Sequence, residues 1–404
     1  MDHSSAARNL RSPDSADASR RVVLVGAGHA HVEVLRRFGL RPPEGVRLTL
    51  VSNSANAVYS GMLPGFIAGH FDAEEIQIPV EPLARFAGCE LVRGEAVALD
   101  PTRKAIRFND GREFIADVVS IDVGAVSNLT NAGSRQETVI GVKPIESFAR
   151  EWESWRLRVE SGSSARIAIV GAGAAGVELA FALQHRLRRN SRGFHSGPGS
   201  EVTLVVDQAG LVPNFSAGVR HRVARLLSER SVAIVTDADF RASARDQRRP
   251  PSYDVTINAA GVILSSWLAA SGLALDQGGF VAVDACLQSV SHSGVFAAGD
   301  AAGMVESPRP KAGVIAVRQG PILAENLRRC AAGEPLLRFI PQETWLSLIS
   351  AGDRYAIASR GDWSAEGHWV WRWKRWIDRR FVSRYTNLPI SRSGIVNKPG
   401  VFTK

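Results

Sequence analysis

The segment "RIAIVGAGAAGVELAFAL" (residues 166–183) decides the fold. An apolar strand runs directly into Gly171, Gly173 and Gly176, which complete the spacing GxGxxG, and a helical pattern follows. The first glycine permits a tight turn, the second lets the backbone approach a pyrophosphate, and the third lets helix and strand pack closely. The helix N-terminus then presents its free N–H groups to the phosphates. We therefore predict a dinucleotide site at this turn.

A carboxylate ends the next predicted strand, "EVTLVVD" (201–207). Asp207 can accept hydrogen bonds from a ribose 2′-OH and would repel a 2′-phosphate, so it favours NADH over NADPH. It lies about 31 residues beyond Gly176, against a usual spacing of about 20. We attribute the excess to the basic segment 186–200, which we expect to be a surface loop. The predicted strand "DVTINAAG" closes this unit at Gly261.

An incomplete copy of the same turn lies near the N-terminus, in "VVLVGAGHAHVEVL" (22–35). Gly26 and Gly28 take the first two glycine positions, but His31 takes the third, and we expect its larger side chain to move the helix slightly outward. A close-packed turn without a ligand is the alternative interpretation. The turns begin 145 residues apart (171 minus 26), which indicates an internal duplication of a nucleotide-binding unit.

The first unit ends like the second, since "DVVSIDVG" (117–124) resembles "DVTINAAG" (254–261) and stops at Gly124. We assign His29 and Ala30, at the start of the first helix, to the nucleotide site. His29 has no neighbouring set of ligands that would make it a metal site, and we expect none.

A third glycine turn occurs in "VFAAGDAAG" (295–303). A strand ends at Gly299 and Asp300 and a new helix follows, so the carboxylate can bind ribityl hydroxyls and the helix N-terminus can lie against a phosphate or flavin edge. An Asp helix cap is the alternative role, and both roles can coexist. After it we expect a helix over 312–333, kinked or broken at Pro321. The glycine-rich segment 58–71 is predicted to be an irregular loop.

Composition narrows the class of protein. The chain has 404 residues, a formal net charge of +9 and three widely spaced cysteines, Cys89, Cys286 and Cys330. That cysteine pattern offers neither a disulfide framework nor a CxxC metal site and fits a reducing compartment. We expect residues 1–20 to be a disordered tail, and no stretch is apolar enough to span a bilayer. The basic charge suits nucleic acid, anionic lipid or anionic cofactors and does not choose among them. We expect no nucleic-acid binding, because no nucleic-acid module is recognisable.

Together these motifs resemble the two-dinucleotide-binding-domain flavoproteins of the pyridine nucleotide–disulfide oxidoreductase superfamily. The phrases "VLVGAGHAHVEVL", "YSGMLPGFIAGHF", "PKAGVIAVRQGP" and "WRWKRWIDRRF" resemble the flavoprotein module associated with selenide, water dikinase, which is similar to type II NADH dehydrogenases and to the apoptosis-inducing-factor group. The resemblance covers roughly residues 21–385.

The resemblance implies an α/β protein with two tandem Rossmann-like domains, in the three-layer, glutathione-reductase-like arrangement, and a C-terminal extension. FAD would occupy a discontinuous domain formed by residues 21–130 and 284–340, and NAD(H) a domain over 131–283. Residues 341–404 would form a basic, tryptophan-rich extension. With the turns above, the expected FAD-binding residues are Gly26, Gly28, His29, Ala30, Val97, Gly124, Gly299 and Asp300, and the NAD(H)-binding residues are Gly171, Gly173, Gly176, Asp207 and Gly261.

The resemblance also suggests roles for individual side chains. Asp300 resembles the family's flavin-contacting aspartate, and Val97, in "GEAVALD", matches the position whose backbone meets the adenine. Glu178, in "GVELA", resembles the glutamate between nicotinamide and flavin in type II NADH dehydrogenases; a helix N-terminal acid stabilised by the dipole is the alternative. Lys311 and Gln319 fall on the segment that approaches the flavin ring, although Lys311 could equally be a surface lysine. We name Glu178, Lys311 and Gln319 as candidate catalytic residues.

The chain departs from the disulfide reductases in one respect, because residues 50–70 contain no cysteine and the three cysteines form no obvious pair. Thiol chemistry is therefore not expected. Hydride transfer from NADH to flavin needs alignment and a suitable electric field, without acid–base residues.

The segment "HWVWRWKRWIDRRF" (368–381) bears on the electron acceptor. Tryptophans recur at helical spacing while arginines fall elsewhere on the wheel, which suits a lipid interface over residues 365–385. Packing on the flavin domain or across a homodimer interface is an equal alternative. The residues of the expected apolar face are Trp369, Trp373, Trp376, Ile377 and Phe381, with Trp371 off that face.

We therefore expect an FAD-dependent NAD(P)H oxidoreductase that passes a hydride from NADH through FAD to an acceptor, with a quinone as the leading candidate. A reductase for a selenium-containing or other small soluble acceptor, and an NADH-responsive interaction switch, are the alternatives. The expected location is cytoplasmic, with possible peripheral contact at the inner face of the cell membrane.

Overall fold

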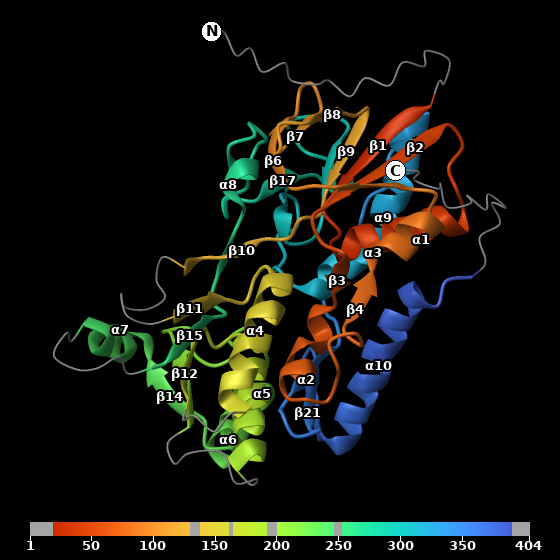
Figure 1. Ribbon diagram of the computed structural model, residues 1–404. Helices are drawn as coiled ribbons and strands as arrows, with labels where there is room; N and C mark the ends of the chain where they lie inside the picture. Colours follow the sequence, from red (N-terminus) through yellow and green to blue (C-terminus); the bar gives the residue numbers. More distant parts are fainter. Residues whose placement is uncertain (1–18, 130–137, 161–164, 192–199, 246–252, 390–404) are drawn as a thin grey trace, which may run out of the picture.

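The structure, a computed structural model, describes residues 19–129, 138–160, 165–191, 200–245 and 253–389. Residues 1–18 of the predicted tail lie outside this part of the chain. The fold is mixed α/β with two parallel five-stranded sheets at opposite ends of the molecule (Figure 1). This confirms the predicted fold class of two tandem Rossmann-like units.

The first sheet is formed mainly by the N-terminal part of the chain and is completed by one late strand. All its neighbouring strands pair in parallel. In spatial order the strands are β18 (Val295–Ala297), β9 (Val118–Ile121), β1 (Arg20–Val25), β2 (Val46–Ser52) and β5 (Glu90–Arg93). The helices around this sheet are α1 (His29–Leu40), α3 (Val80–Phe86) and α9 (Gly313–Ala332).

The second sheet repeats this topology. Its strands in spatial order are β11 (Thr138–Gly141), β15 (Val255–Asn258), β12 (Arg166–Val170), β13 (Glu201–Val206) and β14 (Ala233–Thr236). The accompanying helices are α4 (Ile145–Glu160), α5 (Ala174–Ser191), α6 (Ala217–Glu229) and α7 (Asp237–Arg245). The repetition agrees with the duplication inferred from the two glycine turns.

The sheet strands are apolar because helices or loops cover both of their faces. Val22 to Val25 of β1 are at most 2% exposed, and Ile167 to Ile169 of β12 are equally buried. Helix α9 runs without interruption through Pro321 and ends at Gly333, whose φ of 72° closes a left-handed C-cap. Of the two outcomes expected at Pro321, the break into an irregular turn is therefore wrong, and the kink stays a prediction.

Smaller elements join the sheets. Strands β7 (Ala105–Phe108) and β8 (Glu113–Ile115) form the hairpin predicted around Asp110 and Gly111, and φ of Gly111 is +84°. The additional strands are β3 (Asn56–Val58), β4 (Gln77–Pro79), β6 (Ala96–Asp100), β7 (Ala105–Phe108), β8 (Glu113–Ile115), β10 (Val126–Ser127), β16 (Val262–Ile263), β17 (Val281–Val283) and β19 (Ala302–Met304). The short helices are η1 (Ser60–Met62), α2 (Leu63–Ile67), α8 (Ser266–Ala269) and η3 (Gly299–Ala301).

Two loop predictions are wrong. The segment 58–71 contains η1 and α2 instead of irregular structure, because Pro64 suits the first turn of α2 and Gly65 lets that helix pack against Phe71. The segment 186–191 continues helix α5 to Ser191. Its arginines are good helix formers, so the basic composition did not mark the helix end. Residues 192–199 lie outside the described residues.

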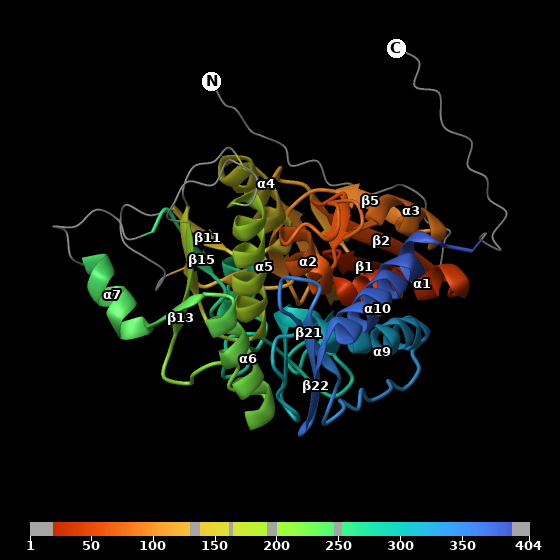
Figure 2. The ribbon, with the colours of Figure 1, turned by 90° about the horizontal axis from the view of Figure 1, so that it is seen from below.

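The C-terminal extension forms an antiparallel sheet and a long helix that contact both halves of the molecule. Its elements are β20 (Ser347–Ser350), β21 (Ala356–Arg360), β22 (Trp363–Gly367) and α10 (His368–Thr386). Helix α10 lies beside α1 of the first unit, and β22 lies beside α6 of the second (Figure 2). The extension therefore bridges the two nucleotide-binding units.

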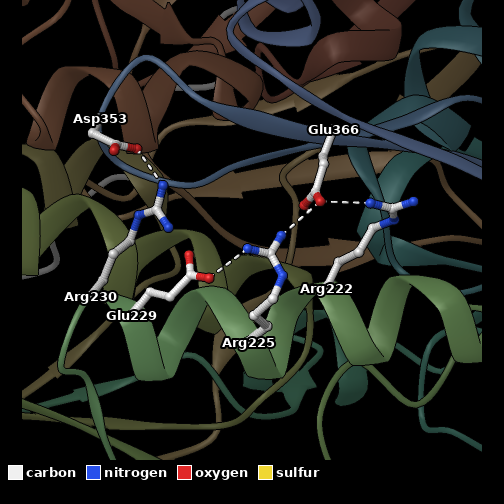
Figure 3. A network of polar contacts seen from close by, with 6 residues as sticks. All are labelled: Arg222, Arg225, Glu229, Arg230, Asp353 and Glu366. Carbon is white, nitrogen blue, oxygen red and sulfur yellow. Dashed lines mark hydrogen bonds and ion pairs between the residues drawn. The ribbon is translucent and has the colours of Figure 1, made fainter.

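Ion pairs reinforce the contact with α6 (Figure 3). Glu366, on β22, accepts hydrogen bonds from Arg222 at 2.6 Å and Arg225 at 2.7 Å. Arg230 donates to Asp353, in the turn between β20 and β21, at 2.7 Å. Because Glu366 is only 16% exposed, its pairs are less screened by solvent than ordinary surface pairs.

Candidate functional site

A cavity of about 400 Å³ runs along the carboxyl ends of the first sheet. Ligands bind at this edge in open parallel sheets. The lining includes Gly26, Gly28 and His29 from the first glycine turn, Ser52 to Ser54 after β2, and Gly124 after β9. Gly299 and Asp300 complete this wall. Ala30, also expected at the nucleotide site, is fully buried and does not line the cavity.

His29 supplies a polar atom to the cavity wall. Its Nε2 is buried and has no hydrogen-bond partner within the described part of the chain. Burial lowers the pKa of His29 to about 4, against the opposing effect of Asp300, so the ring is neutral at pH 7. A neutral imidazole can donate to a phosphate or ribityl oxygen from one ring nitrogen. The long cavity, its glycine-lined turn and this buried nitrogen fit FAD.

Asp300, for which the resemblance suggests a flavin contact, lines the cavity. It forms an ion pair with Lys143, which follows β11 and also lines the cavity. Both side chains are partly buried, with 23% of Lys143 and 16% of Asp300 exposed. The sequence contained no motif that singled out Lys143; only its place after a strand, before Pro144, could have drawn attention to it.

None of the three candidate catalytic residues, Glu178, Lys311 and Gln319, lines this cavity. The Lys311 ammonium donates to the Ala302 carbonyl and lies 3.7 Å from the centre of the Phe280 ring. Gln319 is 2% exposed, and its Oε1 accepts a hydrogen bond from the Gly299 N–H at 2.8 Å. Gln319 therefore supports the glycine–aspartate turn from behind, and Lys311 is held by the neighbouring β19 segment.

Val97 occupies a β-bulge in β6, where the pairing with β7 shifts between Ala96 and Ala98. A bulge leaves the backbone of the extra residue unpaired in the ladder. The preceding residues Glu95 and Ala96 line the cavity, and Val97 itself does not, so its backbone contact with adenine stays a prediction.

The second glycine turn has the geometry that its sequence predicts. A Cβ at Gly176 would lie 1.8 Å from the Gly171 carbonyl oxygen, so close packing requires glycine there. A Cβ at Gly173 would meet nothing within 4 Å, which leaves that face of the turn open. Asp207 follows β13, and its Oδ1 accepts from the Ala209 N–H at 3.0 Å. Gly261 follows β15 at the same edge of the sheet, with φ of +46°.

His31 fills the third glycine position of the first turn through hydrogen bonds. Its Nδ1 lies 2.6 Å from the Gly26 carbonyl oxygen and its Nε2 lies 2.8 Å from Ser120 Oγ on β9. The ring is fully buried. It therefore ties the turn to the sheet, a role that the sequence left open.

A second group of ionisable residues, two buried and two partly buried, lies beneath α10. Lys374 donates to Asp378 at 2.8 Å and to the Gly61 carbonyl at 2.6 Å, and its side chain is 8% exposed. Tyr59 Oη donates to the other Asp378 oxygen at 3.4 Å. Glu178 faces the same group and accepts from the Ser350 N–H at 2.7 Å. We call Tyr59, Glu178, Lys374 and Asp378 the buried charge cluster.

The electrostatics of this cluster keep a proton available near neutral pH. Burial raises the pKa of Glu178 to about 7, although Lys374 opposes the shift. Burial alone would lower the pKa of Lys374, but the carboxylates of Asp378 and Glu178 raise it above its usual value. Lys374 is therefore an ammonium, and Glu178 exchanges its proton near pH 7. Sequence analysis missed Lys374 and Asp378, whose spacing of four residues on a helix was the available signal.

The aromatic face expected for α10 is wrong in part. Trp371, expected off the face, is 9% exposed and packs inward. Phe381 also packs inward and stacks on Tyr59, with ring centroids 4.3 Å apart. Trp369 and Trp376 are 48% and 58% exposed. The helix therefore has tryptophans on both its inward face and its exposed face. The inward face also carries Lys374 and Asp378. In the described residues, no helix combines the length and apolar character needed to cross a membrane.

Comparisons with known proteins agree with this architecture. Residues 20–320 match the model of the family described as pyridine nucleotide-disulphide oxidoreductase. A demethylphylloquinone reductase of Synechocystis sp. is 25% identical over 357 residues, covering 83% of this chain and 86% of the relative. A type II NADH:quinone oxidoreductase of Staphylococcus aureus is 22% identical over 345 residues, covering 79% of this chain and 85% of the relative.

Two solved structures show the same fold. The sulfide:quinone oxidoreductase of Aquifex aeolicus superimposes with a TM-score of 0.71 at 16% identity, covering 93% of both chains. The water-forming NADH oxidase of Lactobacillus brevis, bound to NADH, gives 0.67 at 18% identity and covers 85% of this chain and 75% of its own. The chain therefore belongs to the pyridine nucleotide-disulphide oxidoreductase family and is an FAD-dependent NAD(P)H oxidoreductase.

Proposed function

We propose that the protein oxidises NADH and reduces a quinone. The observation that carries this proposal is the buried charge cluster, in which Glu178 and Lys374 meet beneath α10. The cluster joins a helix of the NAD unit to the extension, and Tyr59 links it toward the FAD cavity through its contact with His29, 5.7 Å between ring centroids. It therefore lies between the nucleotide sites and the exposed face of α10.

The stoichiometry of quinone reduction explains why such a cluster is useful. NADH, one proton and a quinone give NAD⁺ and a quinol, so both quinone oxygens end protonated. The chemistry that bound FAD would supply is acceptance of a hydride and return of the electrons. The protein must supply protons in a region closed to bulk water, and an acid with a pKa near ambient pH is the efficient donor. Glu178 meets that requirement, and the Lys374 ammonium can stabilise charge that develops on a quinone oxygen.

The exposed tryptophans of α10 support access to a lipid-soluble acceptor. Trp369 stacks parallel to Trp373, with ring centroids 6.3 Å apart, and Arg380 lies over the exposed Trp376 ring at 5.4 Å. Tryptophan and arginine side by side suit the headgroup region of a membrane. We propose that this face makes peripheral contact with the inner face of the cell membrane, and a face-to-face homodimer is the competing occupant.

The cysteines do not support thiol chemistry. Cys89 is buried, and burial raises the pKa of its thiol well above the ordinary value. Burial also raises the pKa of Cys286 and of Cys330. No cysteine of the described residues lines the FAD cavity. The names of the two relatives described above, both quinone reductases, also favour a quinone.

The test is steady-state NADH oxidation by the FAD-loaded protein against ubiquinone and menaquinone analogues, dioxygen and selenite. The proposal expects the highest kcat/KM with a quinone. Sedimentation with anionic liposomes, and the oligomeric state in detergent-free buffer, test the lipid contact. Turnover confined to selenite would overturn the proposed quinone activity. A protein that dimerises through α10 and does not sediment with liposomes would overturn the proposed lipid contact.

A further inference from the structure

The carboxylate of Asp122 occupies the N-terminus of α1. Its Oδ2 accepts hydrogen bonds from the N–H groups of Ala30 at 2.8 Å and His31 at 3.0 Å. These are the second and third residues of the helix, whose N–H groups an N-cap side chain normally satisfies. The N-cap residue is Gly28, which has no side chain. Asp122 therefore caps α1 from the end of β9, 92 residues away from Ala30 in sequence.

Two cavity-lining glycines make room for this carboxyl group. A Cβ at Gly28 would lie 2.3 Å from Asp122 Cγ, and a Cβ at Gly299 would lie 2.5 Å from Oδ1. Asp122 itself is 2% exposed and lines the cavity. The Oδ2 atom of Asp122 accepts both of the hydrogen bonds recorded for this side chain. The Oδ1 atom has no hydrogen-bond partner within the described residues.

The duplicated unit provides an internal comparison. In the second unit the position of Asp122 is taken by Ala259, since "DVVSIDVG" matches "DVTINAAG". A methyl group can neither cap a helix nor carry a proton. The space over Gly173 is also open, whereas the equivalent space over Gly28 is filled by the Asp122 carboxyl group. The FAD unit therefore contains an acid at the place where a dinucleotide fold usually presents bare N–H groups to a pyrophosphate.

We propose that Asp122 is a positioning residue that holds a proton while FAD is bound, with Oδ2 accepting from α1 and the protonated Oδ1 donating to a pyrophosphate oxygen. A deprotonated carboxylate would instead repel the pyrophosphate. The protonated side chain is neutral, so it accepts hydrogen bonds from α1 and donates one to the phosphate. The positive end of α1 thereby stabilises the phosphate charge through the Asp122 carboxyl group.

The surroundings support this assignment. Burial, with the Asp300 carboxylate nearby, raises the pKa of Asp122 to about 7, although the two helix N–H groups oppose the shift. The other ionisable groups around it are His29, His31 and the Lys143–Asp300 pair. Burial lowers the pKa of both histidines to about 4, so neither titrates above pH 6. A bound pyrophosphate adds negative charge and raises the pKa of Asp122 further.

A proton that is bound more tightly in the complex makes FAD binding pH-dependent. Above pH 7 the free protein has lost the proton, whereas the complex keeps it, so release of FAD also releases a proton. The FAD dissociation constant should then rise about tenfold per pH unit above pH 7, until the proton also leaves the complex.

The experiment dilutes the full-length holoenzyme at pH 6 to 9 and measures released FAD by fluorescence, with a pH indicator reporting released protons in weak buffer. The wild type should show a constant dissociation constant up to about pH 7 and a rise beyond it, with proton release above pH 7. Asp122→Asn, whose amide can accept from α1 and donate to phosphate without titrating, should bind FAD with little pH dependence and retain it at pH 9.

Asp117→Asn is the matched control, because Asp117 precedes the same strand, accepts from the Arg21 N–H and does not line the cavity. It should keep the wild-type slope. A wild-type dissociation constant that stays flat to pH 9, FAD release without a proton, or an Asp122→Asn variant that keeps the slope or binds FAD weakly at pH 6 would each overturn the proposal. No electron acceptor is involved, so the outcome is independent of the proposed quinone activity.

Discussion

The phenol of Tyr385 donates a hydrogen bond to Glu33 Oε2 at 2.9 Å, across 352 positions of sequence. Glu33 belongs to α1, which follows the first glycine turn, and is 2% exposed. Tyr385 belongs to the last turns of α10. The contact joins the C-terminal extension to the helix that follows the first glycine turn, so we expect the seating of α10 to be coupled to the stability of that turn.

Tyr385→Phe should lower the free energy of unfolding by about 1–3 kcal/mol, because a buried carboxylate oxygen loses its donor while Arg37 still binds the other oxygen. Urea unfolding of the holoenzyme measures the change. Tyr253→Phe is the control, since no hydrogen bond to that hydroxyl is recorded in the described chain, and its change should stay within about 0.5 kcal/mol. Equal effects of the two variants would contradict the coupling.

Lys374→Met should reduce kcat with a quinone by more than about tenfold, because the only ammonium recorded in the buried charge cluster is removed. Anaerobic reduction of the flavin by NADH, measured by stopped flow, should remain unchanged. Arg372→Met removes a cation from the exposed side of the same helix and should leave both rates near wild type. A Lys374→Met variant impaired in NADH reduction but not in quinone turnover would refute this assignment.

Glu178→Gln should change how stability depends on pH. The pKa of Glu178 is raised from 4.5 to about 7, so the folded protein holds the proton more tightly than the unfolded chain. This contribution is complete below pH 4.5 and is lost as pH rises toward 7. Relative to wild type, the variant should therefore gain about 1–3 kcal/mol between pH 5 and pH 8 in urea unfolding. A difference that does not vary with pH would contradict the raised pKa.

Asp207→Ser should raise kcat/KM for NADPH relative to NADH by about tenfold, since the variant no longer repels a 2′-phosphate. Initial rates with each nucleotide give the ratio. Asp254→Ser, at the opposite end of the same sheet, is the control and should keep the wild-type preference. Unaltered selectivity in Asp207→Ser would place nucleotide discrimination elsewhere.

Trp376→Ser should weaken sedimentation with anionic liposomes, because Trp376 is the most exposed tryptophan recorded on α10. Leu157→Ser removes a residue that is 61% exposed on α4, away from this helix, and should bind like wild type. Equal binding by all three proteins would show that α10 does not contact the lipid.

The fold could be predicted because glycine turns are local signals. Gly171, Gly173 and Gly176 are close in sequence, and their backbone geometry depends on a strand and a helix that flank them directly. The duplication then extended the prediction to the incomplete copy at Gly26. Segment 58–71 was predicted wrongly because its three glycines outweighed the preference of Pro64 for the first turn of a helix.

The side-chain partners could not be predicted, because they join residues far apart in sequence. Lys143 meets Asp300 across 157 positions, and Glu178 meets Ser350 across 172. Contacts between residues so far apart leave no periodic pattern in the sequence. The comparison of 117–124 with 254–261 did contain one clue, since Asp122 replaces Ala259 at the end of an otherwise apolar strand.

The central claim is that electrons pass from NADH through FAD to a quinone. It is tested most directly by anaerobic double mixing, in which the FAD-loaded protein is first reduced with one equivalent of NADH and then mixed with a menaquinone analogue. We predict loss of flavin absorbance near 450 nm in the first step and its return within one catalytic turnover in the second. Flavin that NADH does not reduce, or reduced flavin that the quinone leaves unchanged while selenite reoxidises it, would contradict the account.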